Sequence, residues 1–392
     1  MTFAELNNIY KNIHLSEHMN IKIIFSIAVA FTALLPINAQ KLKIGTYTFK
    51  DGAVYQGDLV GGKPNGSGKT TFQNGDVYEG EYVKGKRQGK GIYTFTDGEK
   101  YDGEWLQDHQ HGRGTFYFMN NNRYEGLWYR DFQQGEGTMY YYNGDIYNGD
   151  WKQDKREGHG QYRYKNGASY VGDWKDDKKS GHGTFIWPDS SVYKGSWNDN
   201  QRNGKGTFRY ANGDEYQGDW LNDAQHGKGI YHFANGNVYE GEYQHGERTG
   251  TGIFTFSNGN KYVGQFHGGE QSGQGTYTWK NGAEYKGQWK ANQRHGEGTY
   301  TWPNHDVYQG QWAGGKMHGE GILRLANGTK FKGTFKNGVK DGQCIEEDKD
   351  GLRFEGSYHD GRRHGPFVEK DKNGNIVRQG TYDHGVAIEN QP

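Results

Sequence analysis

One five-residue pattern recurs along this chain at a fixed spacing of 23 residues. It reads Tyr-x-Gly-x-aromatic, begins at Tyr55, and occurs fourteen times without an insertion, with Leu59 in place of the aromatic residue in the first copy and with Phe331 and Phe354 opening the last two. A second marker, Gly-x-Gly, lies between copies and is followed by an alternating aromatic segment and an Asn-Gly or Asp-Gly pair. Self-similarity at such a period is the signature of a repeat architecture built from one supersecondary unit.

Each repeat is predicted to be a β-hairpin. Segments with an aromatic residue at every second position are typical of strands with one apolar face. We expect a type I′ turn at the Asn-Gly pair, because such a turn needs positive φ at both central residues. A looser loop of six residues is expected to follow the second strand and to precede Gly-x-Gly. The glycine of the five-residue pattern would leave a slot for an aromatic ring.

The composition agrees with stacked hairpins rather than with a thick aliphatic core. Among 392 residues there are 65 glycines, 30 tyrosines, 19 phenylalanines and 11 tryptophans. A single hairpin is marginally stable, so consecutive hairpins must bury one another's aromatic faces. The predicted fold class is all-β: an elongated solenoid of about 14–15 consecutive 23-residue antiparallel hairpins, forming a twisted single-sheet ribbon or trough.

The beginning of the chain resembles a targeting segment. An apolar run of thirteen residues, Ile23–Leu35, follows Lys22 and precedes Ala39. This run is short for a membrane span and suits a secretory signal cleaved after Ala39. We therefore predict an exported protein of the periplasm, cell envelope or extracellular space, and an uncleaved N-terminal anchor remains the alternative. The expected organisation is a non-native or disordered extension (1–18), the signal peptide or anchor (19–39), the repeat domain (40–382) and a C-terminal tail (383–392).

Charge and residue types exclude several function classes. Lys and Arg together number 47 and Asp and Glu also number 47, which argues against nucleic-acid binding. The single cysteine, Cys344, excludes an intrachain disulfide and a multi-cysteine zinc site. The segment Lys63–Thr71 is similar to a phosphate-binding loop but lacks the helix that such a loop requires. No catalytic constellation stands out, so we predict no enzyme activity, no cofactor and no metal site.

Several segments resemble the membrane occupation and recognition nexus (MORN) repeat. They are Tyr-Glu-Gly-Glu-Tyr (78–82), Tyr-Asp-Gly-Glu-Trp (101–105) and His-Gly-Glu-Gly-Thr-Tyr-Thr-Trp (295–302), and the resemblance covers about residues 45–385. The resemblance implies a scaffold with protein partners, self-association such as a homodimer, and binding of anionic phospholipid. Similar repeats precede plant phosphatidylinositol phosphate kinase domains, but nothing within these repeats resembles a kinase domain.

Two sets of residues are candidate binding sites. The first is the aromatic face of the repeats: Tyr101, Trp105, Tyr124, Trp128, Tyr147, Trp151, Tyr170, Trp174, Tyr193, Trp197, Tyr216 and Trp220. The second is a basic edge formed by the inter-repeat loops: Lys84, Lys86, Arg87, Lys155, Arg156, Lys290, Arg294, Arg362 and Arg363.

These candidates lead to a function with one alternative. The predicted function is a non-catalytic scaffold for protein and anionic-lipid association in the cell envelope. The alternative is a cell-wall or carbohydrate-binding protein, which would need Tyr and Trp rings that are open to solvent. Burial of these rings between repeats would favour the scaffold.

Overall fold

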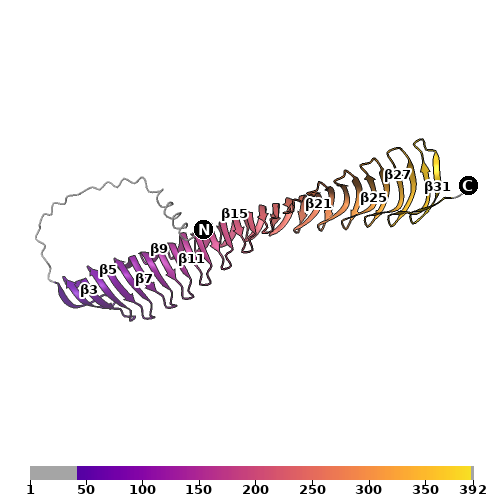
Figure 1. Ribbon diagram of the computed structural model, residues 1–392. Helices are drawn as coiled ribbons and strands as arrows, with labels where there is room; N and C mark the ends of the chain where they lie inside the picture. The colour runs from indigo at the N-terminus through magenta and orange to yellow at the C-terminus, as the bar shows by residue number, and fades with distance from the viewer. Residues whose placement is uncertain (1–41, 390–392) are drawn as a thin grey trace, which may run out of the picture. The chain divides into compact units, whose positions relative to one another are not determined.

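The repeats form one open antiparallel β-sheet. The computed structural model describes residues 42–389, and within them every regular element is a strand. From β1 (Lys43–Thr48) to β28 (Arg353–His359) each strand pairs with its neighbours in sequence. β28 then pairs with both β29 and β30, β30 pairs with β31, and β31 pairs with β32 (Val386–Glu389); the two end strands do not meet. Figure 1 shows the hairpins following one another in chain order along a twisted ribbon. The predicted all-β solenoid of 23-residue hairpins is confirmed.

The strands alternate in length between β2 and β28. The seven-residue strands, which carry the Tyr-x-Gly-x-aromatic pattern, are β2 (Val54–Val60), β4 (Val77–Val83), β6 (Lys100–Leu106), β8 (Arg123–Tyr129), β10 (Ile146–Lys152), β12 (Ser169–Lys175), β14 (Val192–Asn198), β16 (Glu215–Leu221), β18 (Val238–Gln244), β20 (Lys261–His267), β22 (Glu284–Lys290), β24 (Val307–Ala313), β26 (Lys330–Lys336) and β28 (Arg353–His359). The nine-residue strands, which carry Gly-x-Gly, are β3 (Lys63–Thr71), β5 (Lys86–Thr94), β7 (His109–Tyr117), β9 (Phe132–Tyr140), β11 (Lys155–Arg163), β13 (Lys178–Ile186), β15 (Gln201–Arg209), β17 (Ala224–His232), β19 (Glu247–Thr255), β21 (Glu270–Thr278), β23 (Gln293–Thr301), β25 (Lys316–Arg324) and β27 (Val339–Glu347). The sheet ends with β29 (Arg362–Arg363), β30 (Gly365–Lys370), β31 (Ile376–Asp383) and β32.

The two kinds of turn are the reverse of the prediction. Gln107 and Asp108 both have positive φ, at 51° and 76°, so the type I′ turn lies within the segment predicted to be a loose loop. At the other end of β6, the Gly98 amide donates to the Phe95 carbonyl at 3.1 Å and only the glycine has positive φ. That geometry is a type I turn followed by a left-handed glycine. The expected six-residue loops are therefore two-residue turns followed by strand.

The two glycines of Gly-x-Gly serve different purposes. Gly112 has a φ of 57°, in the left-handed region that favours glycine, and it lies at a bulge in the β6–β7 pairing. Gly114 has no such φ, but it lies directly under the Tyr101 ring, and an added Cβ would be 2.5 Å from the ring carbon Cε2. Gly103 is covered by the same tyrosine, with its hydroxyl oxygen 2.5 Å from an added Cβ. The predicted slot exists, and a tyrosine of the same hairpin fills it.

Aromatic side chains on one face of the sheet form a continuous core. Tyr101 is fully buried and packs edge-on against both Trp105 and Trp128, with ring centroids 5.3 Å apart in each pair. Its hydroxyl group donates to the Glu104 carbonyl at 2.9 Å, so the buried polar atom is satisfied. Burial raises the pKa of Tyr101. Tyr239 packs in the same way on Tyr243 of its own repeat and Phe266 of the next, so the core continues along the sheet whichever aromatic residue stands at the fifth position.

Polar groups also link consecutive repeats at the Asn-Gly turns. The Asp214 carboxylate accepts hydrogen bonds from the Tyr231 hydroxyl at 2.8 Å and from the Ala234 amide at 2.7 Å. The Ala234 amide hydrogen bond lowers the pKa of Asp214, although burial opposes that shift. Asn260 makes the equivalent contacts with Tyr277 and Lys280 in a later repeat. A carboxylate or an amide therefore serves at this position.

The C-terminal boundary differs from the prediction. Residues 386–389, expected to lie in a tail, form β32 and pair with β31, with Asp383 opposite Val386. His384 and Gly385 have φ values of 45° and 93° and make another two-residue turn. The sheet thus continues past residue 382, to residue 389. The predicted N-terminal extension (1–18) and signal peptide or anchor (19–39) lie outside the described residues.

Replacing Gly114 by Ala should destabilise the β6–β7 hairpin. The added methyl group would collide with the Tyr101 ring, which cannot move because Trp105 and Trp128 hold it. Overpacking of this kind costs about 1–3 kcal/mol. Amide hydrogen exchange of β6 and β7 is the appropriate measurement, because long repeat arrays do not unfold in a single two-state step.

Gly98→Asn is the matched control for that substitution. Nothing lies within 4 Å of an added Cβ at Gly98, and Asn121 occupies the same position in the next repeat with a φ of 63°. Exchange in β6 should therefore stay near the wild-type rate. Equal exchange rates in the two variants would contradict the role assigned to Gly114.

Asp214→Asn should make the local structure less sensitive to acid. A carboxyl group whose pKa is lowered by folding stabilises the native state above its unfolded pKa of about 3.9, and that stabilisation is lost as the pH falls through the folded pKa. The amide side chain has no such titration. Amide exchange at Ala234 should rise between pH 5 and pH 3 more in the wild type than in the variant. An equal rise in both proteins would contradict this assignment.

Candidate functional site

Basic side chains cover the tryptophans on the aromatic face. Counting the opening Tyr of a repeat as position one, they stand at position ten, the second residue after the type I′ turn. The Arg87 guanidinium carbon lies 4.3 Å from the centroid of the Trp105 ring in the next repeat. Arg156 covers Trp174 at 4.4 Å in the same manner. These are cation–π contacts, which gain strength when the cation is partly desolvated.

In the Arg87, Arg156 and Arg202 repeats an acidic residue at position eight of the next repeat completes the contact. For Arg248 and Arg294 only the backbone carbonyls of Gly269 and Gly315 accept a hydrogen bond from the guanidinium. The Arg156 Nε atom donates to the Asp177 carboxylate at 3.0 Å, and its Nη2 atom donates to the Asp177 backbone carbonyl at 2.8 Å. The Asp177 carboxylate also accepts the Arg156 backbone amide at 3.0 Å. Position eight therefore holds both the backbone and the guanidinium of the preceding repeat.

Two adjacent repeats depart from this arrangement. Gln110 and Gln133 stand at position ten, and no guanidinium among the described residues 42–389 covers Trp128 or Trp151. A hollow of about 910 Å³ opens on the aromatic face at this place. Its lining includes Trp128, Trp151, Phe118, Tyr141, Gln110, Gln133, Asp131 and Asp154, and it extends from Arg87 to Asp177.

The acidic residues of these two repeats are retained although the arginines are not. Asp131 accepts the Gln110 amide at 2.7 Å and also contacts His109 Nδ1 at 2.5 Å. Asp154 accepts the Gln133 amide at 2.8 Å, and within residues 42–389 no basic group lies within 4.0 Å of its carboxylate. The hollow therefore combines exposed carboxylates with aromatic rings, which is the chemistry that receives a cation.

The predicted aromatic site lies in the core. All six of its tyrosines are fully buried, and its six tryptophans are between 4 and 6% exposed. The structure therefore brings these twelve residues together as packing groups, not as an open binding face. Only Trp105, Trp128 and Trp151 of this set line the hollow.

The predicted basic edge divides into two groups. The arginines at position ten, Arg87, Arg156, Arg294 and Arg363, are partly buried over aromatic rings. The remaining residues, Lys84, Lys86, Lys155, Lys290 and Arg362, are exposed at or beside the turns. Acidic side chains share these turns, and Lys155 is paired with Asp176 at 2.9 Å. The edge therefore carries acidic side chains beside its basic ones.

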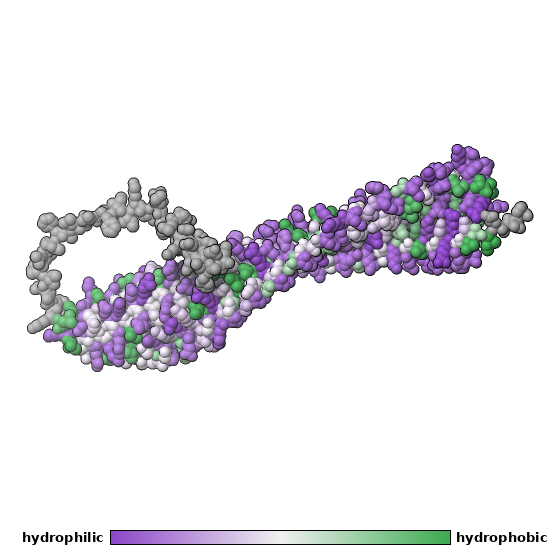
Figure 2. Space-filling view, viewed as in Figure 1, coloured by the Kyte–Doolittle hydropathy of each residue, from purple (hydrophilic) through white to green (hydrophobic). Residues whose placement is uncertain are grey.

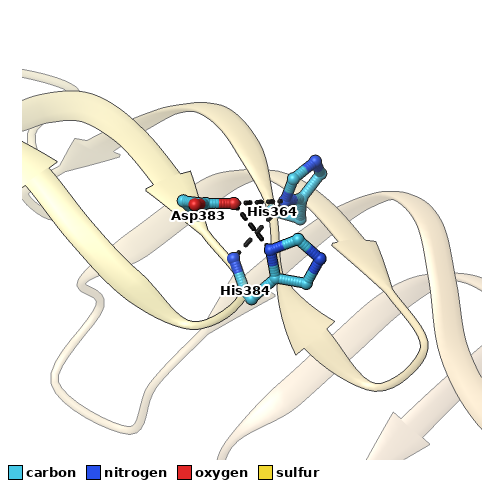
Figure 3. A group of neighbouring side chains, drawn as sticks. All are labelled: His364, Asp383 and His384. Carbon is cyan, nitrogen blue, oxygen red and sulfur yellow. Dashed lines mark hydrogen bonds and ion pairs between the residues drawn. The ribbon is translucent and has the colours of Figure 1, made fainter.

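One cluster at the C-terminal end was not expected from the sequence. The metal-binding atoms of His364, Asp383 and His384 all lie within 4.8 Å of one another (Figure 3). His384 Nδ1 lies 2.6 Å from the Asp383 carboxylate, and His364 Nδ1 lies 3.6 Å from the same carboxylate. The histidines come together because position eleven of one repeat faces position seven of the next. Asp383 and His384 are exposed and His364 is half-buried. The contacts of the two histidines with Asp383 are enough to explain why the three side chains lie together.

The lone cysteine is unsuited to nucleophilic chemistry. Cys344 is buried, and burial raises the pKa of its thiol to about 11. The thiol is therefore protonated at neutral pH, whereas a reactive cysteine is a thiolate.

A family model for the MORN repeat matches fourteen consecutive segments, which run without a gap from residue 55 to residue 376. The chain belongs to the MORN-repeat family. MORN repeats support a scaffold function in general and suggest protein or lipid binding. Among curated proteins, none matches the chain significantly.

Several solved structures resemble parts of the sheet. The TCP10 domain of Danio rerio CPAP, in complex with a peptide of Danio rerio STIL, is 14% identical, covers 52% of this chain and 96% of its own, and has a TM-score of 0.31. The SAS-4 TCP domain of Drosophila melanogaster, in complex with a proline-rich motif of Ana2, is 17% identical over 45% of this chain and 90% of its own, with a TM-score of 0.27. Superposition at this level carries no functional argument.

The hollow corresponds to a sequence pattern that can be recognised only when the structure is known. Position ten is basic in most repeats, and Gln110 and Gln133 are consecutive exceptions in which position eight of the next repeat remains acidic. Without knowledge that position ten covers the tryptophan of the next repeat, the substitution resembles ordinary variation between turns.

Proposed function

We propose that this MORN-repeat chain is a non-catalytic scaffold that binds a partner protein on its aromatic face. The observation that carries the proposal is the hollow of about 910 Å³ at Gln110 and Gln133. In the Arg87, Arg156 and Arg202 repeats the chain's own arginine covers the tryptophan, whereas here two tryptophan rings lie without such a cover beside the carboxylates of Asp131 and Asp154. Aromatic side chains combined with charged groups are the composition of energetically important protein interfaces.

The carbohydrate-binding alternative has less support. Sugar recognition would need the Tyr and Trp rings of the repeat to be open, and rings with exposures between 0 and 6% cannot stack on a sugar. Trp128 and Trp151 approach the surface only at the floor of the hollow. The acidic lining around them favours a cationic protein segment over a neutral glycan.

Anionic phospholipid is a second candidate ligand. It rests on the exposed side chains of Lys84, Lys86, Lys155, Lys290 and Arg362, which resemble an electrostatic membrane contact. The face visible in Figure 2 is mostly hydrophilic, with hydrophobic patches scattered along it. Within residues 42–389 no helix has the length and apolarity to cross a bilayer. Binding to anionic vesicles that disappears at high salt, with no binding to neutral vesicles, would support this candidate.

The proposal places the scaffold in the cell envelope on the strength of the apolar segment Ile23–Leu35. We expect the mature protein to begin at Gln40, as read by mass spectrometry of its N-terminal peptide after cell fractionation. A retained N-terminus in the membrane fraction would indicate an anchor instead. A retained N-terminus in the cytoplasmic fraction would contradict export.

A photo-crosslinking experiment tests the scaffold proposal. A photoreactive phenylalanine analogue at Phe118, which lines the hollow, should capture a partner protein in the cells that make this chain. Phe233 occupies the same position in a repeat that lies outside the hollow, so the analogue at Phe233 serves as the control. Position-dependent capture, strong at Phe118 and weak at Phe233, is the expected result.

Two outcomes would contradict the proposal. Absence of any adduct at Phe118 would remove the partner interaction at the hollow. Adducts of equal yield at both positions would indicate nonspecific contact along the sheet. Because both positions are partly buried aromatic sites, loss of folding would affect the two variants alike.

A further inference from the structure

We propose that the hollow receives two arginine side chains of the partner, one over Trp128 and one over Trp151. The inference rests on the proposed function, because it assigns a ligand chemistry to the same surface. It follows from what the protein itself places in the equivalent positions of other repeats.

The chain contains internal models of the bound state. In the Arg202 repeat, the guanidinium carbon lies 4.3 Å from the Trp220 ring centroid, Nε donates to the Asp223 carboxylate at 2.9 Å, and Nη2 donates to the Asp223 carbonyl at 2.7 Å. The Arg156 contacts agree with these to within about 0.1 Å, an agreement expected of a preorganised site whose bidentate geometry suits the planar guanidinium.

Three of the four elements of this site persist where arginine is missing. Trp128 and Trp151 provide the rings, and Asp131 and Asp154 provide a carboxylate and a backbone carbonyl each. Gln110 and Gln133 are shorter and carry no charge. Among residues 42–389 their side-chain amides have no hydrogen-bond partner, although the two residues are only 8% and 5% exposed. A guanidinium entering from solvent would supply the missing cation, and it could donate to the side-chain amide oxygens of Gln110 and Gln133.

The other repeats with glutamine at position ten lack the carboxylate. Position eight of the following repeat is Gly246 for Gln225 and Asn292 for Gln271. Neither offers a negative charge to a cation over the ring. The combination of an uncovered tryptophan and a retained aspartate therefore occurs in two consecutive repeats, which makes the hollow a paired site.

The spacing of the pair limits the ligand. Two strands separate equivalent points of consecutive repeats, which places them about 10 Å apart. Three residues of polyproline II chain span about 9 Å, and side chains three positions apart lie on the same face of that helix. A segment with arginines three positions apart, Arg-x-x-Arg, therefore matches the two subsites, and both side chains are long enough to reach the rings.

A short synthetic peptide tests this assignment on the full chain. Acetyl-Arg-Gly-Gly-Arg-amide should bind in isothermal calorimetry, and the same peptide with citrulline in place of both arginines should bind at least tenfold more weakly. Citrulline keeps the shape of the side chain but loses the positive charge. Replacement of both arginines by lysine should also weaken binding, because an ammonium group cannot donate in a fork to one aspartate.

Two double variants test the two halves of the site. Asp131→Asn with Asp154→Asn removes the charges, and the fold tolerates Asn at this position, as Asn200 and Asn292 show. Gln110→Arg with Gln133→Arg fills the hollow with the chain's own guanidinium groups, as in the Arg87 and Arg156 repeats. Each double variant should weaken peptide binding at least tenfold.

The matched control is Gln225→Arg with Gln271→Arg, which adds the same charge in repeats outside the hollow. Its affinity should stay within twofold of the wild type. Equal binding by all variants, equal binding of the citrulline peptide, or no binding to the wild type would overturn the inference.

The scaffold proposal and this inference can fail separately. If the analogue at Phe118 captures a partner equally well in the wild type and in the Gln110→Arg, Gln133→Arg background, the scaffold stands and the arginine site is wrong. If the arginine peptide binds as expected but Phe118 captures no partner, the site stands and the proposed scaffold function fails.

Discussion

The whole sheet depends on one contact, that of a tyrosine ring lying flat over two glycines. The Tyr101 ring covers Gly103 on its own strand and Gly114 on the next, and its hydroxyl group is satisfied by the Glu104 carbonyl. A single sheet has no second layer to bury its apolar face. The ring reaches complete burial because the glycines let it sink to the backbone and the tryptophans of two repeats close over it.

The second constraint is that, in many repeats, a basic residue covers the aromatic ring of the next repeat. The position-ten arginine covers the tryptophan of the following repeat, and the position-eight aspartate of that repeat binds the arginine in return. Stability therefore accumulates through interfaces between adjacent units, as in other repeat proteins. A departure at position ten has a local effect, since it uncovers one tryptophan without breaking the backbone ladder. This explains how Gln110 and Gln133 can open a hollow in a sheet that otherwise keeps its register.

Much of the fold was predictable because the pattern is periodic. The period of 23, the alternation of aromatic residues and the Asn-Gly pairs predict consecutive antiparallel hairpins, and the strands from β2 to β28 follow that order. The turn types were assigned the wrong way round. Several of the actual type I′ turns, such as Gln107–Asp108, contain no Gly, and their positive φ is imposed by the twist of the flanking strands. The site was less predictable, since exposed and buried residues of one type look alike in a sequence: Arg156 is partly buried against Trp174, whereas Lys155 beside it is exposed.

The sequence by itself determined the repeat length, the hairpin order and the aromatic composition of one face, because these follow from local spacing and the two-residue period of a strand. Only the tertiary structure decided what that face does. Whether a ring is core or surface depends on which side chain of the next repeat lies over it, and that partner stands about twenty residues away. The burial of Tyr101, the covering of Trp174 by Arg156 and the exposure of Asp154 beside Trp151 are consequences of this register between repeats.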